Sequence, residues 1–380
     1  MMTVISRKFA RDILLSTAFV LLILIALFAF FDLIGQLDEV GEGQYTIGRA
    51  FLFTALSTPS RAYEITPLAA LLASVYTMSR WASTSEFTVL RASGYSPASL
   101  ARAMILPGLV LVLLTFALGE VIGPAGQRYA QELRSGEKAT LSARGFSSGA
   151  WVRDVTANEA GDPVDRYINV RSISAADRHS TGAWRMFEFS RADGRLLRLV
   201  RAESALFTPG RGWELSRATV VHYPKLSAGA SGEAQGPVET ERMETLFLKS
   251  TVDPEILGVM TANPSNMSMY DLRRYIEHMQ LVKQDTEHYV SIFWGKAFYP
   301  FACFVMLALA MPFAYMNARS GGMAIKIFGG VILGITFYAL NNVFGYLSLF
   351  SALPAALMAA FPSLVMLALA AASMWWLERR

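Results

Sequence analysis

The feature that most constrains this chain is the grouping of its apolar residues into blocks of about twenty at both ends of the sequence. A helix needs about twenty mostly apolar residues to cross the hydrocarbon core of a bilayer. Residues 124–288, between the blocks, have the mixed composition of an ordinary soluble domain. Only 17% of all residues are charged, whereas a soluble protein usually has about 25%. The sequence therefore predicts a membrane protein with one large inserted domain.

Six segments reach, or can be extended to, the length of a membrane span. The second is the least regular, because its apolar part, Ile65–Met78, is too short alone. We expect its helix to begin near Ala50 and to pass through two prolines and the pair Arg61 and Glu64, which share a helix face and can pair. The predicted spans are Ile13–Ile34, Ala50–Met78, Met104–Ile122, Ala297–Met316, Ile327–Phe350 and Leu353–Leu377.

The basic residues in the short flanking segments predict the orientation of these spans, because cytoplasmic loops carry an excess of Lys and Arg. Both chain ends and the loop 79–103 are basic, whereas the loop 35–49 holds one arginine against three acids and residues 346–352 carry no charge. We therefore expect both termini in the cytoplasm and the inserted domain in the periplasm. The predicted domains are residues 1–123 (spans one to three), 124–288 (the inserted domain) and 289–380 (spans four to six).

The inserted domain shows strand signals separated by turn residues at intervals of about ten to fifteen residues, which is typical of a meander, a sandwich or a roll. Residues 125–138 are expected to extend span three as a polar helix. A capping box at Ser268–Asp271 predicts a helix through about Lys283. The predicted strands are 185–190, 196–207, 213–223 and 243–248, and a Gly/Ala/Ser-rich loop is expected at 227–236. The predicted fold class is an α-helical membrane protein with an all-β insertion.

The motifs of the common catalytic and cofactor sites do not occur in the sequence. It contains no G-x-x-x-x-G-K-[ST] phosphate loop, no G-x-S-x-G elbow and no metal-ligand spacing among its four histidines. The single cysteine, Cys303, excludes an intrachain disulfide. The net charge of +4, with no basic run interleaved with aromatics, does not favour nucleic acid. We therefore expect no enzyme, no metal and no cofactor bound by this chain.

Several polar residues lie in or near the predicted spans, where ionisable and polar groups are functional candidates by default. Asp32, Glu64 and Glu120 lie near a helix end or break, so either an interfacial position or a proton relay fits them. Asn341 and Asn342 lie deeper in span five. They fit hydrogen bonding between helices or a polar contact with a substrate.

The loop between spans two and three predicts a short amphipathic helix from about residue 84 to 94. It carries one acid, Glu86, and one base, Arg91, with Phe87 and Leu90 on its apolar side, and Gly94 helps to end it. Packing at the membrane interface and docking to a partner protein both fit such a helix.

At this loop the sequence becomes similar to a known family. SEFTVLRASGYSP (85–97) closely resembles the S-E-[LMF]-x-V-[LM]-x-A-[SC]-G-x-S motif of the lipopolysaccharide export permeases of the LptF/LptG type. ITPLAALLASVYTMSRWASTSE (65–86), LGEVIGPAGQRYA (118–130) and FYALNNVFG (337–345) resemble other parts of that family. The resemblance covers the whole chain and is nearer to the LptG branch than to the LptF branch.

The resemblance implies a half-transporter in the inner membrane of a Gram-negative bacterium that extracts lipopolysaccharide from the membrane. Its implied partners are a paralogous LptF-like permease, a dimeric cytoplasmic LptB-like ATPase that binds ATP and Mg²⁺, and a single-span LptC-like protein that delivers the lipid to a periplasmic bridge. It places Glu86, Phe87, Leu90 and Arg91 on a coupling helix that docks on the ATPase. It also implies that the insertion is a β-jellyroll and that spans one and five line the entry for lipid.

Exposing one acyl chain of about a dozen carbons to water costs on the order of 10 kcal/mol, at about 0.8 kcal/mol for each methylene. The lipid therefore needs an apolar path. We expect the alternating strand residues Phe187, Phe189, Leu197 and Leu199 to face an apolar interior on that path, and Asp32, Asn341 and Asn342 to be further candidates.

One departure from the family concerns the outer end of span one, where some LptG-type proteins carry basic residues. This chain has Asp32, Asp38 and Glu39 there, so phosphate recognition has to come from other cations, a divalent metal bridge or the partner permease. The alternative functions are an LptF-type paralogue of the same exporter, a membrane-anchored periplasmic sensor or assembly factor, and a proton-driven secondary transporter. The short cytoplasmic segments disfavour a sensor, and the lack of similarity between the two halves disfavours a secondary transporter.

Overall fold

In the computed structural model the chain divides into two compact units, each described here by itself. The helical unit comprises Met1–Ala130, Ser268–Tyr270 and Glu287–Arg380, and the β-domain comprises Gln131–Met267 and Asp271–Thr286. The structure describes residues 4–38, 40–41, 45–84, 86, 89, 92, 96–135, 150–158, 161–171, 179–224, 237–254, 256–257, 264–281, 283–315, 322–351 and 353–379.

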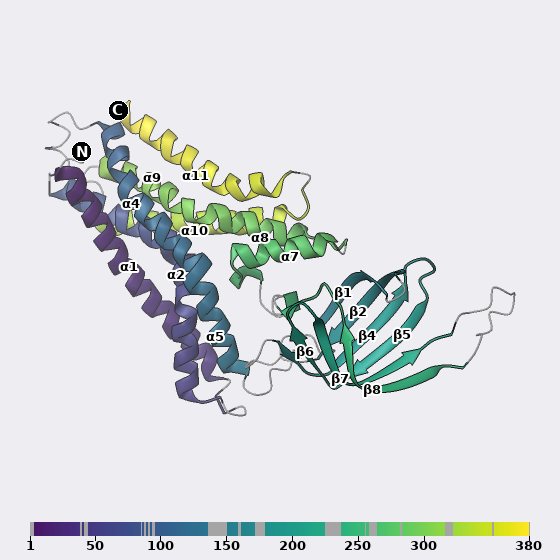
Figure 1. The fold of residues 1–380 in the computed structure, drawn as a ribbon. Helices are drawn as coiled ribbons and strands as arrows, with labels where there is room; N and C mark the ends of the chain where they lie inside the picture. The colour runs from purple at the N-terminus through teal and green to yellow at the C-terminus, as the bar shows by residue number, and fades with distance from the viewer. Residues whose placement is uncertain are drawn as a thin grey trace. The chain divides into compact units, whose positions relative to one another are not determined.

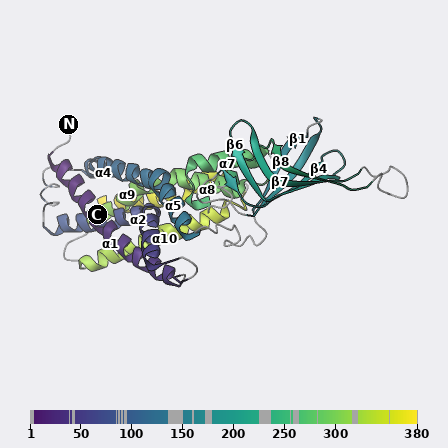
Figure 2. The ribbon, with the colours of Figure 1, turned by 60° about the horizontal axis from the view of Figure 1, so that its bottom comes forward.

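Long helices form the helical unit, and α1 lies along α2 (Figures 1 and 2). The uninterrupted α-helices of this unit include α1 (Val4–Leu37), α2 (Ile47–Ser83), α10 (Met323–Leu347) and α11 (Ala355–Glu378). Two composite helices are interrupted: α4 (Pro97–Ala117) continues through the π-helix η1 (Leu118–Ile122) into α5 (Gly123–Ser135), and α8 (Glu287–Phe298) continues through the 3₁₀-helix η4 (Tyr299–Phe301) into α9 (Ala302–Tyr315).

Among the residues that the structure describes, five helical stretches are long and apolar enough to cross a membrane, namely Ser6–Leu37, Ala98–Ala130, Glu287–Tyr315, Met323–Leu347 and Ala355–Trp376. They confirm a multi-pass helical membrane protein and agree with five of the predicted spans. The helix of the second predicted span also forms: α2 is continuous and passes through Pro59 and Pro67, as the sequence required. Its composition, however, is not apolar enough to place it among the five.

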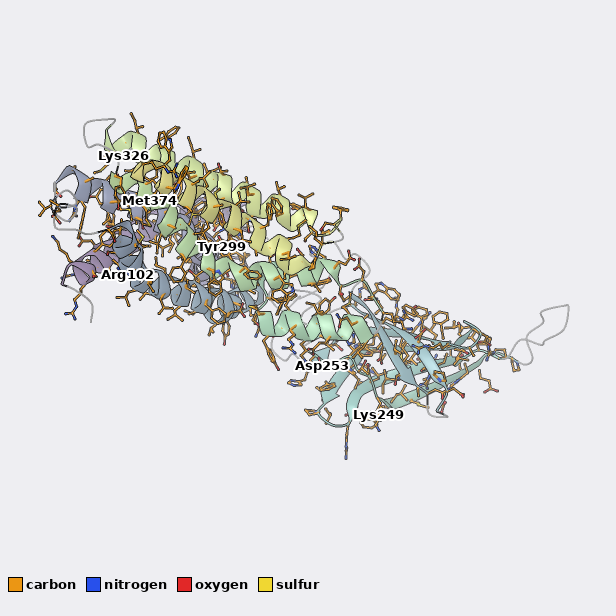
Figure 3. All side chains as sticks on the ribbon, turned by 90° about the horizontal axis from the view of Figure 1, so that it is seen from above. Arg102, Lys249, Asp253, Tyr299, Lys326 and Met374 are labelled. Atoms are coloured by element: carbon orange, nitrogen blue, oxygen red, sulfur yellow. The ribbon has the colours of Figure 1, made fainter. Side chains whose placement is uncertain are left out.

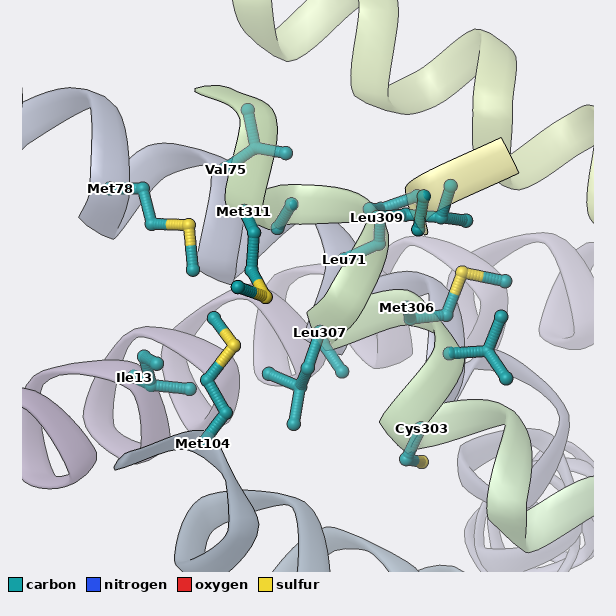
Figure 4. Close-up of a cluster of buried hydrophobic side chains, with 14 of the residues drawn as sticks. Ile13, Leu71, Val75, Met78, Met104, Cys303, Met306, Leu307, Leu309 and Met311 are labelled. Carbon is teal, nitrogen blue, oxygen red and sulfur yellow. The ribbon is translucent and has the colours of Figure 1, made fainter. Parts of the chain in front are cut away.

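Helix α9 supplies much of the buried core of the helical unit, as Figure 4 shows. Met306 and Leu307 of α9 are each 1% exposed, and they pack in one cluster with Ile13 of α1 and Leu71 of α2, which are fully buried. Cys303 is buried in the same cluster, with its Sγ 3.4 Å from the hydroxyl of Thr115 on α4. Helices α1, α2, α4 and α9 are therefore held together by one apolar core.

The β-domain is built on one antiparallel sheet, a curved half-barrel (Figure 1). The strand order is β1-β2-β4-β5-β7-β6-β3, and β8 pairs with the other side of β7. The strands are β1 (Ala150–Ala157), β2 (Pro163–Val170), β3 (Ser180–Thr181), β4 (Trp184–Ser190), β5 (Leu196–Ala202), β6 (Ser204–Thr208), β7 (Gly212–His222) and β8 (Glu239–Leu248).

The predicted strands 185–190, 213–223 and 243–248 are confirmed as β4, β7 and β8, but the predicted strand 196–207 is wrong as a single element. It is divided into β5 and β6, which follow one another along the same side of β7. The break at Glu203 lies opposite Arg217, whose φ of 50° is unusual for a non-glycine residue. This local change of backbone direction separates the two strands. The predicted loop 227–236 lies outside the described residues.

The core of the β-domain covers one face of this sheet. Trp184 and Trp213 are buried with their ring centroids 4.9 Å apart, and the Trp213 indole donates a 2.7 Å hydrogen bond to the carbonyl of Val252. Fully buried Asp154 accepts hydrogen bonds from the hydroxyls of Ser250 (2.7 Å) and Thr251 (2.6 Å). The segment that follows β8 is therefore fixed across the core face of the sheet.

Helix α7 (Met269–Leu281) confirms the helix predicted to start at the capping box. Within the β-domain, Arg274 of α7 pairs with Asp253 at 2.6 Å (Asp253 is labelled in Figure 3). His278 is 6% exposed, and burial lowers its pKa below the usual value, against the opposing charges of Asp154 and Asp253. The polar helix predicted at 125–138 is confirmed over α5, and residues 136–138 lie outside the described residues.

Candidate functional site

Glu86 is held at the end of α2 by the first turns of α1. Its carboxylate lies 3.0 Å from the ammonium of Lys8, and that ammonium lies 5.3 Å from the centroid of Trp81. The Trp81 indole donates to Asp12 at 3.0 Å, and its ring packs edge-on against Phe9 at 5.0 Å. The side chain of Glu86 remains 40% exposed. The arrangement therefore positions this carboxylate and leaves it accessible to a partner.

The rest of the predicted coupling helix is described only in part. Glu86, Val89 and Ala92 have helical backbone, and Val89 is 67% exposed. Phe87, Leu90 and Arg91 lie outside the described residues. Their role on a coupling helix therefore stays a prediction.

A second charged cluster lies at the other end of α1. Arg61 of α2 binds Asp32 of α1 through two hydrogen bonds, Nε to Oδ2 at 3.0 Å and Nη2 to Oδ1 at 2.9 Å. It also donates to Glu64 at 3.1 Å, which confirms the pair predicted from their spacing. One guanidinium is thus shared by two carboxylates. The cluster has a net charge of −1 and does not offer a free cation to a lipid phosphate.

The region around Glu64 also contacts η4 and the end of α8. The Tyr299 hydroxyl donates to the backbone carbonyl of Glu64 (Tyr299 is labelled in Figure 3). The rings of Tyr63 and Tyr299 have centroids 4.9 Å apart, and the Lys296 ammonium lies 5.9 Å from the centroid of Tyr63. Helix α2 is therefore fixed on two sides at the level of the Asp32–Arg61 pair.

The two asparagines of α10, Asn341 and Asn342, have different surroundings. Asn342 is exposed and donates to the carbonyl of Tyr338 at 3.0 Å within its own helix, and Asn341 is half-buried. Gly334 of α10 packs closely on α2, since a Cβ there would lie 2.2 Å from Leu68. The structure therefore brings α10 close to α2 through Gly334 and does not bring Asn342 to another helix.

Three glycines on η1 and α5 permit close contact with α2. A Cβ on Gly119 would lie 2.5 Å from the ring of Tyr63, and a Cβ on Gly126 would lie 2.3 Å from the backbone oxygen of Leu56. Gly119 and Gly123 form the G-x-x-x-G spacing that allows helices to approach closely. The π-helix between them holds Glu120, whose carboxylate accepts a 2.6 Å hydrogen bond from the amide of Met269. Glu120 therefore links η1 to the first residue of α7.

We expect replacement of Gly126 by alanine to lower stability by about 1–3 kcal/mol, because overpacking against a fixed backbone forces the two helices apart. Gly345 is the matched control, since it is helical and a Cβ there meets nothing within 4 Å. Gly345→Ala should be neutral or stabilising by up to about 1 kcal/mol. Thermal unfolding of the detergent-purified chain measures both, and equal melting temperatures for the two variants would contradict this packing.

The strand residues predicted to face an apolar interior lie on the face of the sheet opposite the core cluster. The core-facing residues of β4 are Trp184 and Met186, each 1% exposed, so the alternating Phe187 and Phe189 face the other side and are half-buried. Leu199 pairs with Phe187 across the strands and shares that face. Their place on an apolar lipid path stays a prediction, because apolar residues occupy both faces of β4 and the alternation does not say which face borders such a path.

This second face of the sheet carries an aromatic cluster with charged neighbours. Trp151 stacks on Phe187 at 5.9 Å, and Tyr167 packs edge-on against Phe189 at 5.7 Å. Burial raises the pKa of Asp165, but hydrogen bonds from Arg191 (2.8 Å) and Arg153 (2.9 Å) outweigh it, so the pKa lies below its usual range. Leu197 is half-buried beside the irregular pairing of β4 and β5.

No group of three or more His, Cys, Asp and Glu side chains able to hold a metal ion occurs among the residues that the structure describes. The Lys8–Glu86 and Asp32–Arg61 pairs could not be found from the sequence, because their members are 78 and 29 residues apart.

Comparison with known proteins covers almost the whole chain. The sequence profile of the family described as lipopolysaccharide export system permease LptF/LptG matches residues 7–379. The lipopolysaccharide export system permease protein LptG of Escherichia coli strain K12 is 26% identical over 381 aligned residues, which cover 99% of this chain and 98% of that protein. The protein of the same name from Haemophilus influenzae is also 26% identical, over 100% of this chain and 99% of that protein.

Proposed function

The chain belongs to the LptF/LptG family of lipopolysaccharide export permeases, the non-catalytic membrane subunits of an ABC transporter in the Gram-negative inner membrane, and we propose that it is the LptG-type half of that exporter. The observation that carries the proposal is the family match over residues 7–379. Two relatives named LptG, aligned over nearly their full length, support the LptG branch.

We propose that α2 is a sixth span and that it crosses the membrane over the same distance as α1. Asp12 and Asp32 are 20 residues apart on α1, about 30 Å along a helix, which matches the hydrocarbon thickness of a bilayer. Helix α2 meets both positions, with Arg80 at 3.7 Å from Asp12 and Arg61 at 2.9 Å from Asp32. Between them the buried residues of α2 are mostly small ones such as Ala69 and Ser74. A helix that faces other helices rather than lipid does not need an apolar surface, and small residues let neighbouring helices approach.

We propose that Glu86, with Phe87, Leu90 and Arg91 beside it, docks on a cytoplasmic LptB-like ATPase. The half-exposed carboxylate beside Lys8 is the described part of this surface. A carboxylate suits a contact that passes movement between subunits, because charge-assisted hydrogen bonds to a cation of the partner are short and strong. This assignment places both termini in the cytoplasm and the β-domain in the periplasm.

The further partners in this proposal are an LptF-like permease and a single-span LptC-like protein. The edge strand β8 is ten residues long and mostly exposed, which suits pairing with a strand of the next domain. A chain of jellyroll-like domains joined in this way would continue the lipid path. We propose that α1 and α10 line the lateral entry for lipid, with Asp32, Asn341 and Asn342 near it and Phe187, Phe189, Leu197 and Leu199 further along the path.

The test is purification of the tagged chain from its native membrane in mild detergent, with identification of all proteins and lipids that accompany it. We expect a second permease of the same family, an ATP-binding subunit and lipopolysaccharide. Recovery of the chain alone, or with a signalling protein and no ATPase, would exclude the proposed assembly.

A further inference from the structure

Three arginines of the β-domain lie in one row across adjacent strands of the sheet. Arg185 of β4 is directly opposite Arg201 of β5, Arg201 is opposite Thr219 of β7, and Thr219 is opposite Arg242 of β8. Directly opposed residues of an antiparallel pair share a face and have Cα atoms about 4.5–5.5 Å apart. The three side chains therefore project from the same face, with Arg242 about 10 Å beyond Arg201.

The positive charge of this row has no acidic partner among the residues that the structure describes. All three arginines are exposed, and none of their side chains forms an ion pair or hydrogen bond with another residue in the described part of the chain. In the next row, Glu203 is bound by Arg217 at 2.6 Å. Like charges directly opposite one another destabilise a sheet, so this arrangement lowers stability unless an anion binds between them.

The surroundings of the row are suited to an amphipathic anion. On one side lies an apolar row of the same face, which contains Tyr167, Phe187 and Leu199 in direct register. Trp151, 45% exposed, stands at the β1 end of the arginine row and stacks on Phe187. Guanidinium groups bind phosphate oxygens in pairs of parallel hydrogen bonds, and the neighbouring aromatic rings supply apolar contact area.

We propose that this arginine row binds the phosphorylated headgroup of the exported lipopolysaccharide, with Arg185, Arg201 and Arg242 on the phosphates. The inference rests on the proposed function for the identity of the ligand. It supplies cations for phosphate recognition that the Asp32–Arg61–Glu64 cluster does not have. The headgroup is preferred to an acidic protein because arginines and an apolar aromatic row lie side by side, as the polar and apolar parts of a lipid do.

The experiment uses the assembled exporter in proteoliposomes with purified lipopolysaccharide, intact or stripped of its phosphates. A photo-crosslinking amino acid replaces Trp151 in one sample, and Phe31 of α1, 59% exposed, in another. The Trp151 position reports the arginine row, and the Phe31 position reports lipid at the membrane helices. We expect both to crosslink to intact lipopolysaccharide, and only the Trp151 position to lose its crosslink when the phosphates are removed.

The triple change Arg185→Gln, Arg201→Gln and Arg242→Gln should reduce the crosslink at position 151 by at least about tenfold, since it removes three charged hydrogen-bonding groups. The control, Arg211→Gln, Arg273→Gln and Lys283→Gln, removes the same charge from exposed basic residues of the same domain. It should leave the crosslink unchanged. An equal loss in both triple variants, or none in either, would overturn the proposal.

A separate variant distinguishes a loss of lipid binding from a loss of folding. Thr219→Glu places an acid between Arg201 and Arg242, and should raise the melting temperature of the chain while weakening the crosslink. A higher melting temperature with an unchanged crosslink would mean that the row is only a source of repulsion and would overturn the inference. A crosslink at position 31 without one at position 151, or a protein crosslinked at position 151 in place of lipid, would overturn the inference alone. No crosslink at either position would overturn the proposed function with it.

Discussion

Replacing Glu86 with lysine is expected to reduce the ATP hydrolysis that lipopolysaccharide stimulates in the assembled exporter by at least about tenfold. Hydrogen bonds to a charged group contribute about 1.5–3 kcal/mol, and each 1.4 kcal/mol is about a factor of ten in an equilibrium constant. Reversal of the charge adds repulsion to this loss. The measurement is ATPase activity in proteoliposomes, together with the amount of ATPase that remains bound to the permeases.

The contact between Glu86 and Lys8 requires a control, because the variant also breaks this 3.0 Å pair. An exposed ion pair of this kind contributes at most about 1 kcal/mol to stability, so its loss alone should change little. The double variant Lys8→Glu with Glu86→Lys restores an opposite-charge pair within the chain but still presents the wrong charge to a partner. We expect it to remain inactive. Full recovery of activity in the double variant would show that Glu86 only anchors α1 to α2.

The membrane helices were predictable because a span leaves a direct signal in the sequence. Several predicted span ends lie within a few residues of the helix ends. For example, the sixth span was predicted to begin at Leu353, and α11 begins at Ala355. Helix α2 was the exception, since its residues are small and polar where they face other helices. Its hydropathy did not mark it as a span. It was found only by extending the helix through Pro59 and Pro67.

The sheet was predictable only where strands alternate in the usual way. Strands β1 and β2 were missed because charged residues lie on their core side, where an apolar residue is expected. Arg166 of β2 is 4% exposed and binds Glu188 at 2.6 Å, and Asp154 of β1 is fully buried. Arg198 completes this layer at 3.0 Å from Glu188. Buried charges need partners, and these partners come from strands far apart in the sequence, so the pattern of one strand does not show them.

Replacing Arg61 with leucine is expected to have the second large effect, a loss of about 2–3 kcal/mol of stability. The change leaves the carboxylates of Asp32 and Glu64 close together without their shared cation, near a bilayer where unpaired charges are costly. Asp32→Asn should cost less than about 1 kcal/mol, because the 3.1 Å pair between Arg61 and Glu64 remains. Thermal unfolding of the purified chain in lipid nanodiscs measures both.

The double variant decides whether the two residues act through one another. The charge of Asp32 should lower stability only when Arg61 is absent. In that case Asp32→Asn should recover roughly half of the stability that Arg61→Leu loses, because one of the two unpaired charges is removed. The interaction energy from this double-mutant cycle should then be on the order of 1–2 kcal/mol. Strictly additive effects would mean that water or lipid headgroups solvate both carboxylates. In that case the pair would not fix α1 to α2 at the membrane boundary, and the proposed register of α2 as a sixth span would lose its outer anchor.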